Sequence, residues 1–301
     1  MSDAAPFRCA AASLRRDEPA AGTASTVRAY LLVENDGPWG VDVWRDARMG
    51  PAVRAALRDR AQRARVRPLL VRRHRGHGSE PGFRVFAAYA DPDAPWLETA
   101  VVDTEGGLLD LDLESLGAGR SPGLTPTDQP LFLVCTHGRH DTCCAELGRP
   151  TASALTLSHP EHTWEVSHIG GDRFAANVLV LPDGLYYGRV GDLDAPVLAQ
   201  RHLDGHLDVD RLRGRSGYAF PVQVAEVAVR RAAGETRKDA VRMLWARPDG
   251  DDTHASFDVS GTTYAVRVRR TLGVAQQLTC RALRDNGVPA YEVVNISAGT
   301  A

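Results

Sequence analysis

The sequence contains almost no lysine and no long apolar run. Lys238 is the only lysine, and the 36 basic residues nearly balance 38 acidic ones. Because the arginines are dispersed among acids, they do not predict binding to nucleic acid. No apolar run approaches 18 residues and no signal-peptide core is present, so we expect no membrane insertion and no export. The composition therefore predicts a cytoplasmic protein without a nucleic-acid or membrane partner.

Two catalytic patterns are also missing. The chain has no Cys-x-x-Cys motif, which disfavours a standard disulfide exchanger, and no paired carboxylates stand out as they would in a glycosidase. Five cysteines form an odd set, and three of them lie within ten residues. This pattern suits a metal site in a reducing compartment better than a disulfide scaffold. A redox carrier is favoured over a catalyst, although the sequence leaves enzymatic activity open.

The segment with three cysteines has the pattern of a strand followed by a helix. The apolar run from Leu131 to Val134 predicts a buried strand that places Cys135 at its end. A polar loop then leads to Cys143 and Cys144, after which small apolar residues recur at helical spacing, with an interruption expected near Gly148 and Pro150. The thiols are therefore predicted to lie at a strand-to-helix turn.

A second polar cluster follows the next strand. From Thr163 the residues alternate in polarity up to His168, which predicts a strand with His168 at its end. Gly170 and Gly171 would let the backbone turn closely there, and Asp172 follows. Neighbouring strand ends in an α/β layer open at the same edge of the sheet. We therefore expect the thiols and this imidazole to converge.

These motifs resemble the sucrase/ferredoxin-like family. The resemblance rests on Cys-x8-Cys from Cys135 and on His-x-Gly-Gly-Asp-Arg-Phe-Ala from His168. Leu-Pro-Asp-Gly-Leu-Tyr-Tyr-Gly from Leu181, the segment from Ser13 to Ala24 and Arg-Gly-Arg-Ser from Arg213 extend it over most of the chain. It implies a thioredoxin-like fold, a 2Fe-2S cluster and electron transfer, and no sugar chemistry.

The resemblance also implies a ligand set. Cys135 and Cys144 match the two cysteine ligands, and His168 matches the first of two histidines spaced His-x3-His. Asp172 stands at the second histidine position, where a carboxylate would lower the potential relative to imidazole. We therefore predict a cluster on Cys135, Cys144, His168 and Asp172. The other candidates for the fourth ligand are Cys143 and then His137 or His140.

Two other functions remain open. Zinc accepts the same donors, although Cys-x8-Cys is wider than zinc-finger spacing, so a zinc-stabilised binding module is one alternative. The other is a thiol-based redox enzyme that uses Cys135 or the Cys143/Cys144 pair, with Arg139 or His140 lowering the thiol pKa. Cys9 and Cys280 are isolated in sequence and are expected to be buried apolar residues. A carrier would need a partner, which we expect to be a flavin- or NAD(P)-linked reductase.

One order of elements occurs twice along the chain, namely strand, helix, strand, strand, strand. It predicts an α/β fold with two tandem thioredoxin-like units, each a mixed sheet flanked by helices, and a small C-terminal α+β appendage. We place an arm with a short helix at 1–27, a unit without cysteine ligands at 28–128, the ferredoxin unit at 129–212 and the appendage at 213–301. In the appendage we expect strands at 256–259, 263–269 and 291–296 and a helix at 275–284.

Overall fold

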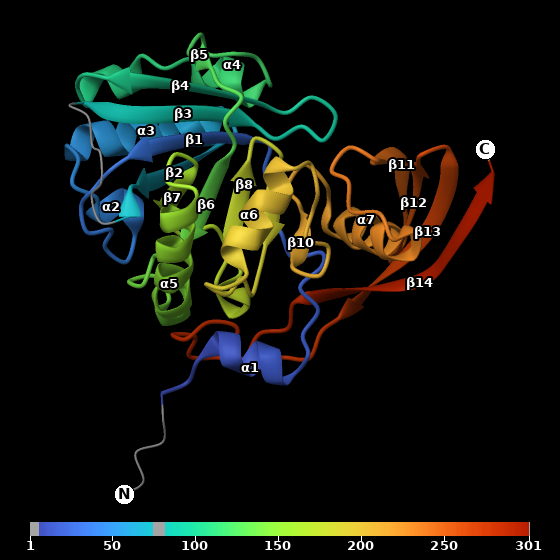
Figure 1. Ribbon diagram of the computed structural model, residues 1–301. Helices are drawn as coiled ribbons and strands as arrows, with labels where there is room; N and C mark the ends of the chain where they lie inside the picture. Colours follow the sequence, from blue (N-terminus) through green and yellow to red (C-terminus); the bar gives the residue numbers. More distant parts are fainter. Residues whose placement is uncertain (1–5, 75–81, 301) are drawn as a thin grey trace, which may run out of the picture.

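The computed structural model describes residues 6–74 and 82–300 and contains two units with the same strand topology (Figure 1). In each unit the first two strands are parallel, and the third and fourth continue the sheet antiparallel on the other side of the first. The strand order is therefore second, first, third, fourth in both units. The predicted fold class is confirmed, and the shared order supports the tandem repeat, which no residue identity had revealed.

The bounds of the elements agree closely with the sequence pattern in most places. The first unit and the arm contain α1 (Cys9–Arg15), β1 (Ala29–Glu34), α2 (Val43–Asp46), α3 (Pro51–Arg63), β2 (Val66–Arg72), β3 (Phe83–Tyr89), β4 (Trp96–Val102), η2 (Gly106–Leu109), α4 (Leu113–Gly117) and β5 (Thr125–Pro126). The second unit contains β6 (Leu131–Cys135), α5 (Thr142–Ser158), β7 (Thr163–Val166), η3 (Asp172–Phe174), β8 (Val178–Leu181), β9 (Leu185–Tyr187), α6 (Ala195–Leu203) and β10 (Leu212–Arg215).

The two units share one ten-stranded sheet. They join where β2 pairs antiparallel with β7, with Val71 opposite Val166 and Arg72 opposite Glu165. At this seam the Arg72 guanidinium donates to the Glu165 carboxylate at 2.6 Å, and Thr136 Oγ1 donates to the same carboxylate at 2.7 Å. The buried Glu165 therefore connects both units to the loop that follows β6. The seam is therefore a short strand pairing, reinforced by the buried Glu165, and not a flexible linker.

The sheet curls until its two halves face each other. Tyr30 on β1 and Tyr186 on β9 share a hydrogen bond of 3.3 Å between their hydroxyls, although five steps separate these strands in the sheet. A flat sheet would place them roughly 24 Å apart, since neighbouring strands lie about 4.8 Å apart. One apolar core fills the space between the halves, while α3 and α5 pack against the other face of their own units. Every central strand is thereby buried on both faces.

The C-terminal region is a separate antiparallel sheet covered by one helix. It consists of α7 (Phe220–Ala233), β11 (Val241–Asp249), β12 (Asp252–Val259), β13 (Thr262–Leu272) and β14 (Pro289–Thr300). The helix predicted at 275–284 is wrong, because this segment is irregular and closes on itself through a Gln276–Asn286 bridge. Leu283 is 99% exposed, so the segment has no apolar face to pack against a core as an amphipathic helix would.

The helix that begins near the cysteines is continuous. The interruption predicted near Gly148 and Pro150 is absent, because α5 runs without a break from Thr142 to Ser158. Gly148 has a packing role there, since a Cβ at this position would lie 2.1 Å from the carbonyl oxygen of Cys135. The glycine therefore lets α5 approach the end of β6 more closely than any other residue would. Across the described residues, no helix combines the length and apolarity needed to cross a bilayer.

Candidate metal centre

Parallel strands bring the first thiol and the imidazole to one edge of the sheet. In the pairing of β6 with β7, Cys135 lies opposite Val166, so the two strands end side by side. The backbone continues this alignment, because Thr136 N–H donates to the carbonyl of Val166 at 3.3 Å. His168 follows two residues after β7, in a loop and not within the strand as predicted. The convergence expected from the order of the elements is present.

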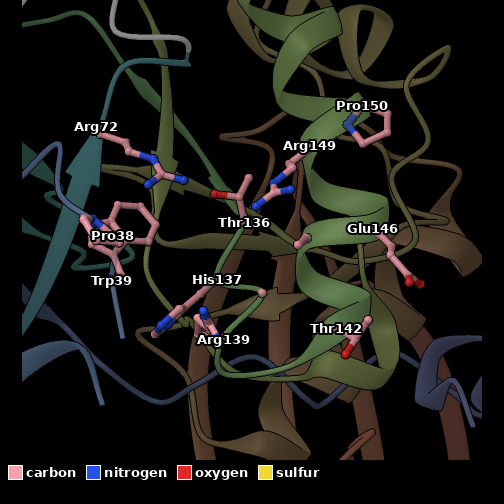
Figure 2. A pocket seen from close by; sticks show the side chains of 12 residues that line it. Pro38, Trp39, Arg72, Thr136, His137, Arg139, Thr142, Glu146, Arg149 and Pro150 are labelled. Carbon is pink, nitrogen blue, oxygen red and sulfur yellow. The ribbon is translucent and has the colours of Figure 1, made fainter. Parts of the chain in front are cut away.

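A cleft of about 690 Å³ lies at the seam beside the loop from Thr136 to Thr142 (Figure 2). Arg72 and Trp39 of the first unit form one wall, and the guanidinium of Arg72 lies 4.2 Å from the centre of the indole. The opposite wall belongs to the second unit and includes the exposed side chain of Arg149 on α5. The cleft therefore presents basic groups next to the loop that joins Cys135 to the helix of Cys143 and Cys144.

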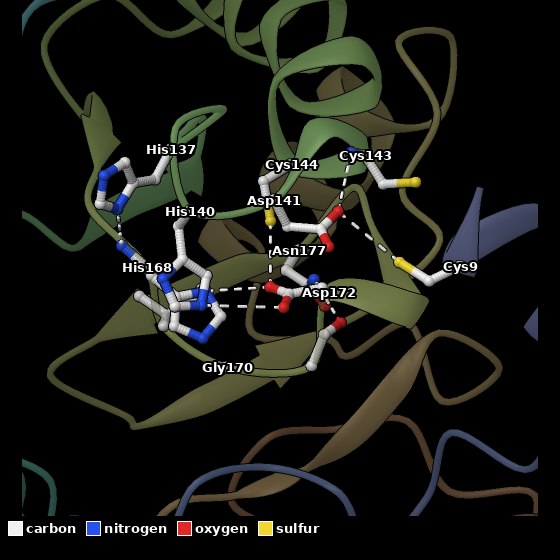
Figure 3. Close-up of polar contacts among 12 residues, drawn as sticks. Cys9, His137, His140, Asp141, Cys143, Cys144, His168, Gly170, Asp172 and Asn177 are labelled. Atoms are coloured by element: carbon white, nitrogen blue, oxygen red, sulfur yellow. Dashed lines mark hydrogen bonds and ion pairs between the residues drawn. The ribbon is translucent and has the colours of Figure 1, made fainter. Parts of the chain in front are cut away.

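Helix α5 presents two neighbouring cysteines in opposite directions. Asp141 caps the helix, since its Oδ1 accepts from the N–H of Cys143 at 2.9 Å. The Cys144 sulfur points toward Asp172, while Cys143 points to the other side of Asp141, toward Cys9 (Figure 3). All five cysteines of the chain are free. No vicinal disulfide therefore joins Cys143 to Cys144.

Three predicted ligands meet in one place. One ligand atom each from Cys135, Cys144 and His168 lies within 4.8 Å of the others. Asp172 adjoins this group, because its Oδ1 is 3.2 Å from the sulfur of Cys144 and 3.0 Å from Nδ1 of His168. The structure thus brings Cys135, Cys144 and His168 together, while Asp172 groups with His168 and His140. Cys143 faces away from them. Their ligation of a metal stays a prediction.

The other two histidines of the loop lie in different positions. The ring of His140 stacks on that of His168 with 3.7 Å between centres, and its Nε2 is 3.8 Å from Asp172 Oδ2. His137 uses both ring nitrogens elsewhere: Nδ1 accepts from the backbone N–H of His168 at 3.3 Å, and Nε2 donates to the carbonyl of Gly40 at 2.7 Å. His140 therefore remains a possible fourth ligand, whereas His137 positions the loop.

The side chains of the centre strongly perturb one another. Hydrogen bonds from Cys144 and from His168 hold the pKa of Cys135 well below its usual range despite its burial. The pKa of Cys144 is raised, because its hydrogen bond to Cys135 and its burial both favour the protonated thiol. Burial opposes protonation of His168, but hydrogen bonds to Asp172 and Cys135 outweigh it and raise the pKa to about 9. These opposed shifts are typical of functional sites.

The two sides of the centre differ in their access to solvent. Cys135, Cys144 and Asp172 are buried, whereas the side chains of His168 and His140 are 24% and 38% exposed. A bound metal would therefore be reached from outside through the histidines and not through the sulfurs.

A buried arginine that the sequence interpretation did not place supports the loop of His168. Arg213 on β10 donates to the carbonyl of Gly170 at 3.0 Å and to Oδ1 of Asn177 at 2.8 Å. Burial lowers the pKa of Arg213 to about 10. Gly171 adopts a φ of +81°, and a Cβ there would lie 2.2 Å from the guanidinium. Arg213 was noted only as part of Arg-Gly-Arg-Ser, and nothing in its spacing indicates that it contacts residues 43 and 36 positions away.

The donor set suits a thiolate-bound metal. Two thiols and an imidazole from separate segments lie close enough to surround one centre, and the Asp172 carboxylate lies beside them. This combination is compatible with an iron–sulfur cluster or with zinc. The cysteine-rich group is thus a candidate metal site.

One family model matches a large part of the chain. No curated protein matches the chain. Among solved structures, a cysteine-to-serine variant of the thioredoxin-like [2Fe-2S] ferredoxin from Aquifex aeolicus is 23% identical, and the match covers 28% of this chain and 95% of that one with a TM-score of 0.24. The family model described as sucrase/ferredoxin-like matches residues 20–214, which is more than half of the chain. The chain therefore belongs to the sucrase/ferredoxin-like family.

Proposed function

We propose that the protein is a one-electron carrier with a 2Fe-2S cluster held by Cys135, Cys144, His168 and Asp172. The observation that carries the proposal is the convergence of two buried thiols and one partly exposed imidazole within 4.8 Å at the edge of the sheet. When bound, such a cluster supplies a one-electron couple whose potential depends on its ligands and on the charges around them.

The chain itself would contribute position and charge. Asp141 fixes the start of α5 and so the place of Cys144, while Gly148 keeps α5 against the backbone of Cys135. Arg213 and Asn177 hold the turn at Gly170 and Gly171 that aims His168 and Asp172 at the thiols. The buried cation of Arg213 also favours a negatively charged centre over a neutral one. These residues orient the ligands without being ligands.

The alternative as a thiol enzyme has less support. The lowered pKa of Cys135 would favour a nucleophilic thiolate, but both sulfurs are almost fully buried, so a protein disulfide could not reach them. Zinc on the same four residues is the other alternative, and only metal analysis separates it from iron.

A redox partner would dock over the exposed histidines. The basic cleft of Arg72, Arg139 and Arg149 borders the same loop, so an acidic surface on a flavin- or NAD(P)-linked reductase would complement it. Free buried thiols also fit our proposal that the protein works in the reducing cytoplasm.

The test is purification under anaerobic conditions followed by a visible spectrum and iron and sulfide analysis. We expect iron and acid-labile sulfide in equal amounts, with loss of colour in Cys135→Ser and Cys144→Ser. Asp172→Ala should lose colour and His140→Ala should keep it. Colour lost in His140→Ala and kept in Asp172→Ala would move the fourth ligand to His140. Protein that contains zinc and no iron would reject the carrier.

A further inference from the structure

The three cysteines outside this centre form a second cluster. Cys9 comes from α1, Cys143 from the start of α5 and Cys280 from the connection between β13 and β14, yet their sulfurs meet. Cys280 Sγ lies 3.4 Å from Cys143 Sγ and 3.6 Å from Cys9 Sγ. All five cysteines of the chain thus belong to one of two groups.

A carboxylate completes the second group. Asp141 is fully buried, and its Oδ1 lies 3.6 Å from the sulfur of Cys9. The same carboxylate accepts the backbone N–H of Cys280 at 2.7 Å and that of Cys143 at 2.9 Å. It forms no ion pair with any arginine, lysine or histidine in the described part of the chain. The carboxylate, which these donors hold in place, lies among three thiols and no cationic side chain, so the group offers oxygen and sulfur donors to a metal cation.

Three distances between the ligand atoms are close to those of tetrahedral coordination. Zn²⁺ binds sulfur at about 2.3 Å and carboxylate oxygen at about 2.0 Å, so tetrahedral angles place two sulfurs about 3.8 Å apart and a sulfur and an oxygen about 3.5 Å apart. The observed separations are 3.4 and 3.6 Å between sulfurs and 3.6 Å between sulfur and oxygen. The backbone N–H of Cys9 also points at the sulfur of Cys280, at 3.5 Å, which suits a thiolate acceptor.

We propose that Cys9, Cys143, Cys280 and Asp141 form a structural zinc site separate from the cluster site. Structural zinc sites are closed, four-coordinate and rich in cysteine, and here the carboxylate of Asp141 takes the place of the fourth sulfur or nitrogen. Zinc accepts a carboxylate oxygen and needs no change of oxidation state. The ion would fasten the irregular segment 273–288 and α1 to the helix that carries Cys144. In Figure 1 this connection, in red, passes beside α1. The segment buries little apolar surface of its own, as Val274 and Leu283 are exposed.

The first test measures zinc, iron and sulfide in the full-length chain and its variants. We expect about one zinc per chain in the wild type, as a single closed site requires. Cys280→Ser and Cys9→Ser should lose the zinc and keep the visible spectrum, while Cys135→Ser should lose the iron and keep the zinc. Thr279→Ala, a change beside Cys280 that removes no thiol, is the matched control and should keep both metals. Wild-type protein without zinc would overturn the proposal.

A second measurement uses the wild type alone, in case the variants do not fold. Thiols are alkylated before and after treatment with a chelator, with and without added Zn²⁺, and the labelled positions are mapped by mass spectrometry. Cys9, Cys143 and Cys280 should react together only after chelation, and Zn²⁺ should restore their protection. Equal labelling in all samples, or a disulfide within the group, would overturn the proposal. Because zinc and iron are counted separately, failure here leaves the electron-carrier proposal standing.

Discussion

Gly148 offers a sharp test of how the thiols are positioned. A Cβ in Gly148→Ala would lie 2.1 Å from the carbonyl oxygen of Cys135 and 3.1 Å from its carbonyl carbon. Ordinary contact begins near 3.4 Å, so α5 must move by roughly 1 Å away from β6. Alanine normally stabilises a helix by about 1 kcal/mol relative to glycine, but overpacking costs about 1–3 kcal/mol. We expect a net loss of stability at a position where helix propensity alone predicts a gain.

The same movement of α5 away from β6 would separate the sulfur of Cys144 from that of Cys135. Cys144 lies in the first turn of α5, and a ligand set tolerates displacements of only about 0.5 Å. We therefore expect metal affinity to fall roughly 10- to 100-fold, the range for residues that orient metal ligands.

Thermal unfolding and iron content of Gly148→Ala are compared with those of Gly299→Ala. The control makes the same chemical change at an exposed site with nothing within 4 Å of the added methyl group. Each kcal/mol lowers the Tm of a large domain by roughly 2–4 °C. A Gly148→Ala protein with full iron content and an unchanged or higher Tm would refute the reasoning.

Three further predictions concern charge. Asp172→His should keep the visible spectrum and raise the midpoint potential, measured by redox titration, because neutral imidazole replaces a carboxylate; an unchanged potential would speak against Asp172 as a ligand. Glu226→Gln leaves Arg215 and Arg230 buried without their shared carboxylate. The free energy of unfolding, measured in urea, should therefore fall by about 3–5 kcal/mol. A loss below about 1 kcal/mol would contradict this prediction. The pKa of Asp183 is lowered to about 2, since its ion-pair partners outweigh burial. The ionised carboxylate therefore stabilises the fold by about 2 kcal/mol above pH 4, and this stabilisation is lost as the pH falls toward 2. In urea unfolding, the difference in free energy of unfolding between wild type and Asp183→Asn should become smaller from pH 4 to pH 2. A difference that stays constant over this range would contradict the prediction.

Local patterns predicted most of the strands because burial dictates them. The strand Leu131–Cys135 has almost the bounds expected from its apolar run, Leu131 to Val134. The repeated order of elements was also sufficient to predict two units of one plan. The helix expected at 275–284 failed because periodicity indicates a helix only where a partner surface covers the apolar face.

Contacts between distant segments were beyond the reach of the sequence. His168 was found because strand ends converge predictably, but its support from Arg213 depends on where β10 joins the sheet. Cys9 and Cys280 are 271 positions apart and were expected to be unrelated buried residues. The tertiary fold brings them together, through the curled sheet and the connection between β13 and β14. The spacing of residues along the sequence does not predict either feature.

The seam between β2 and β7 fixes the position of the cysteine-free unit relative to the candidate metal centre. Domains joined by a flexible linker reorient relative to each other. The distance between an electron donor on one domain and an acceptor bound to the other then changes with each movement. Here the ladder locks the cysteine-free unit to its neighbour. If the protein carries electrons as we propose, a partner that binds the cysteine-free unit would hold its own redox group at a fixed distance from the centre.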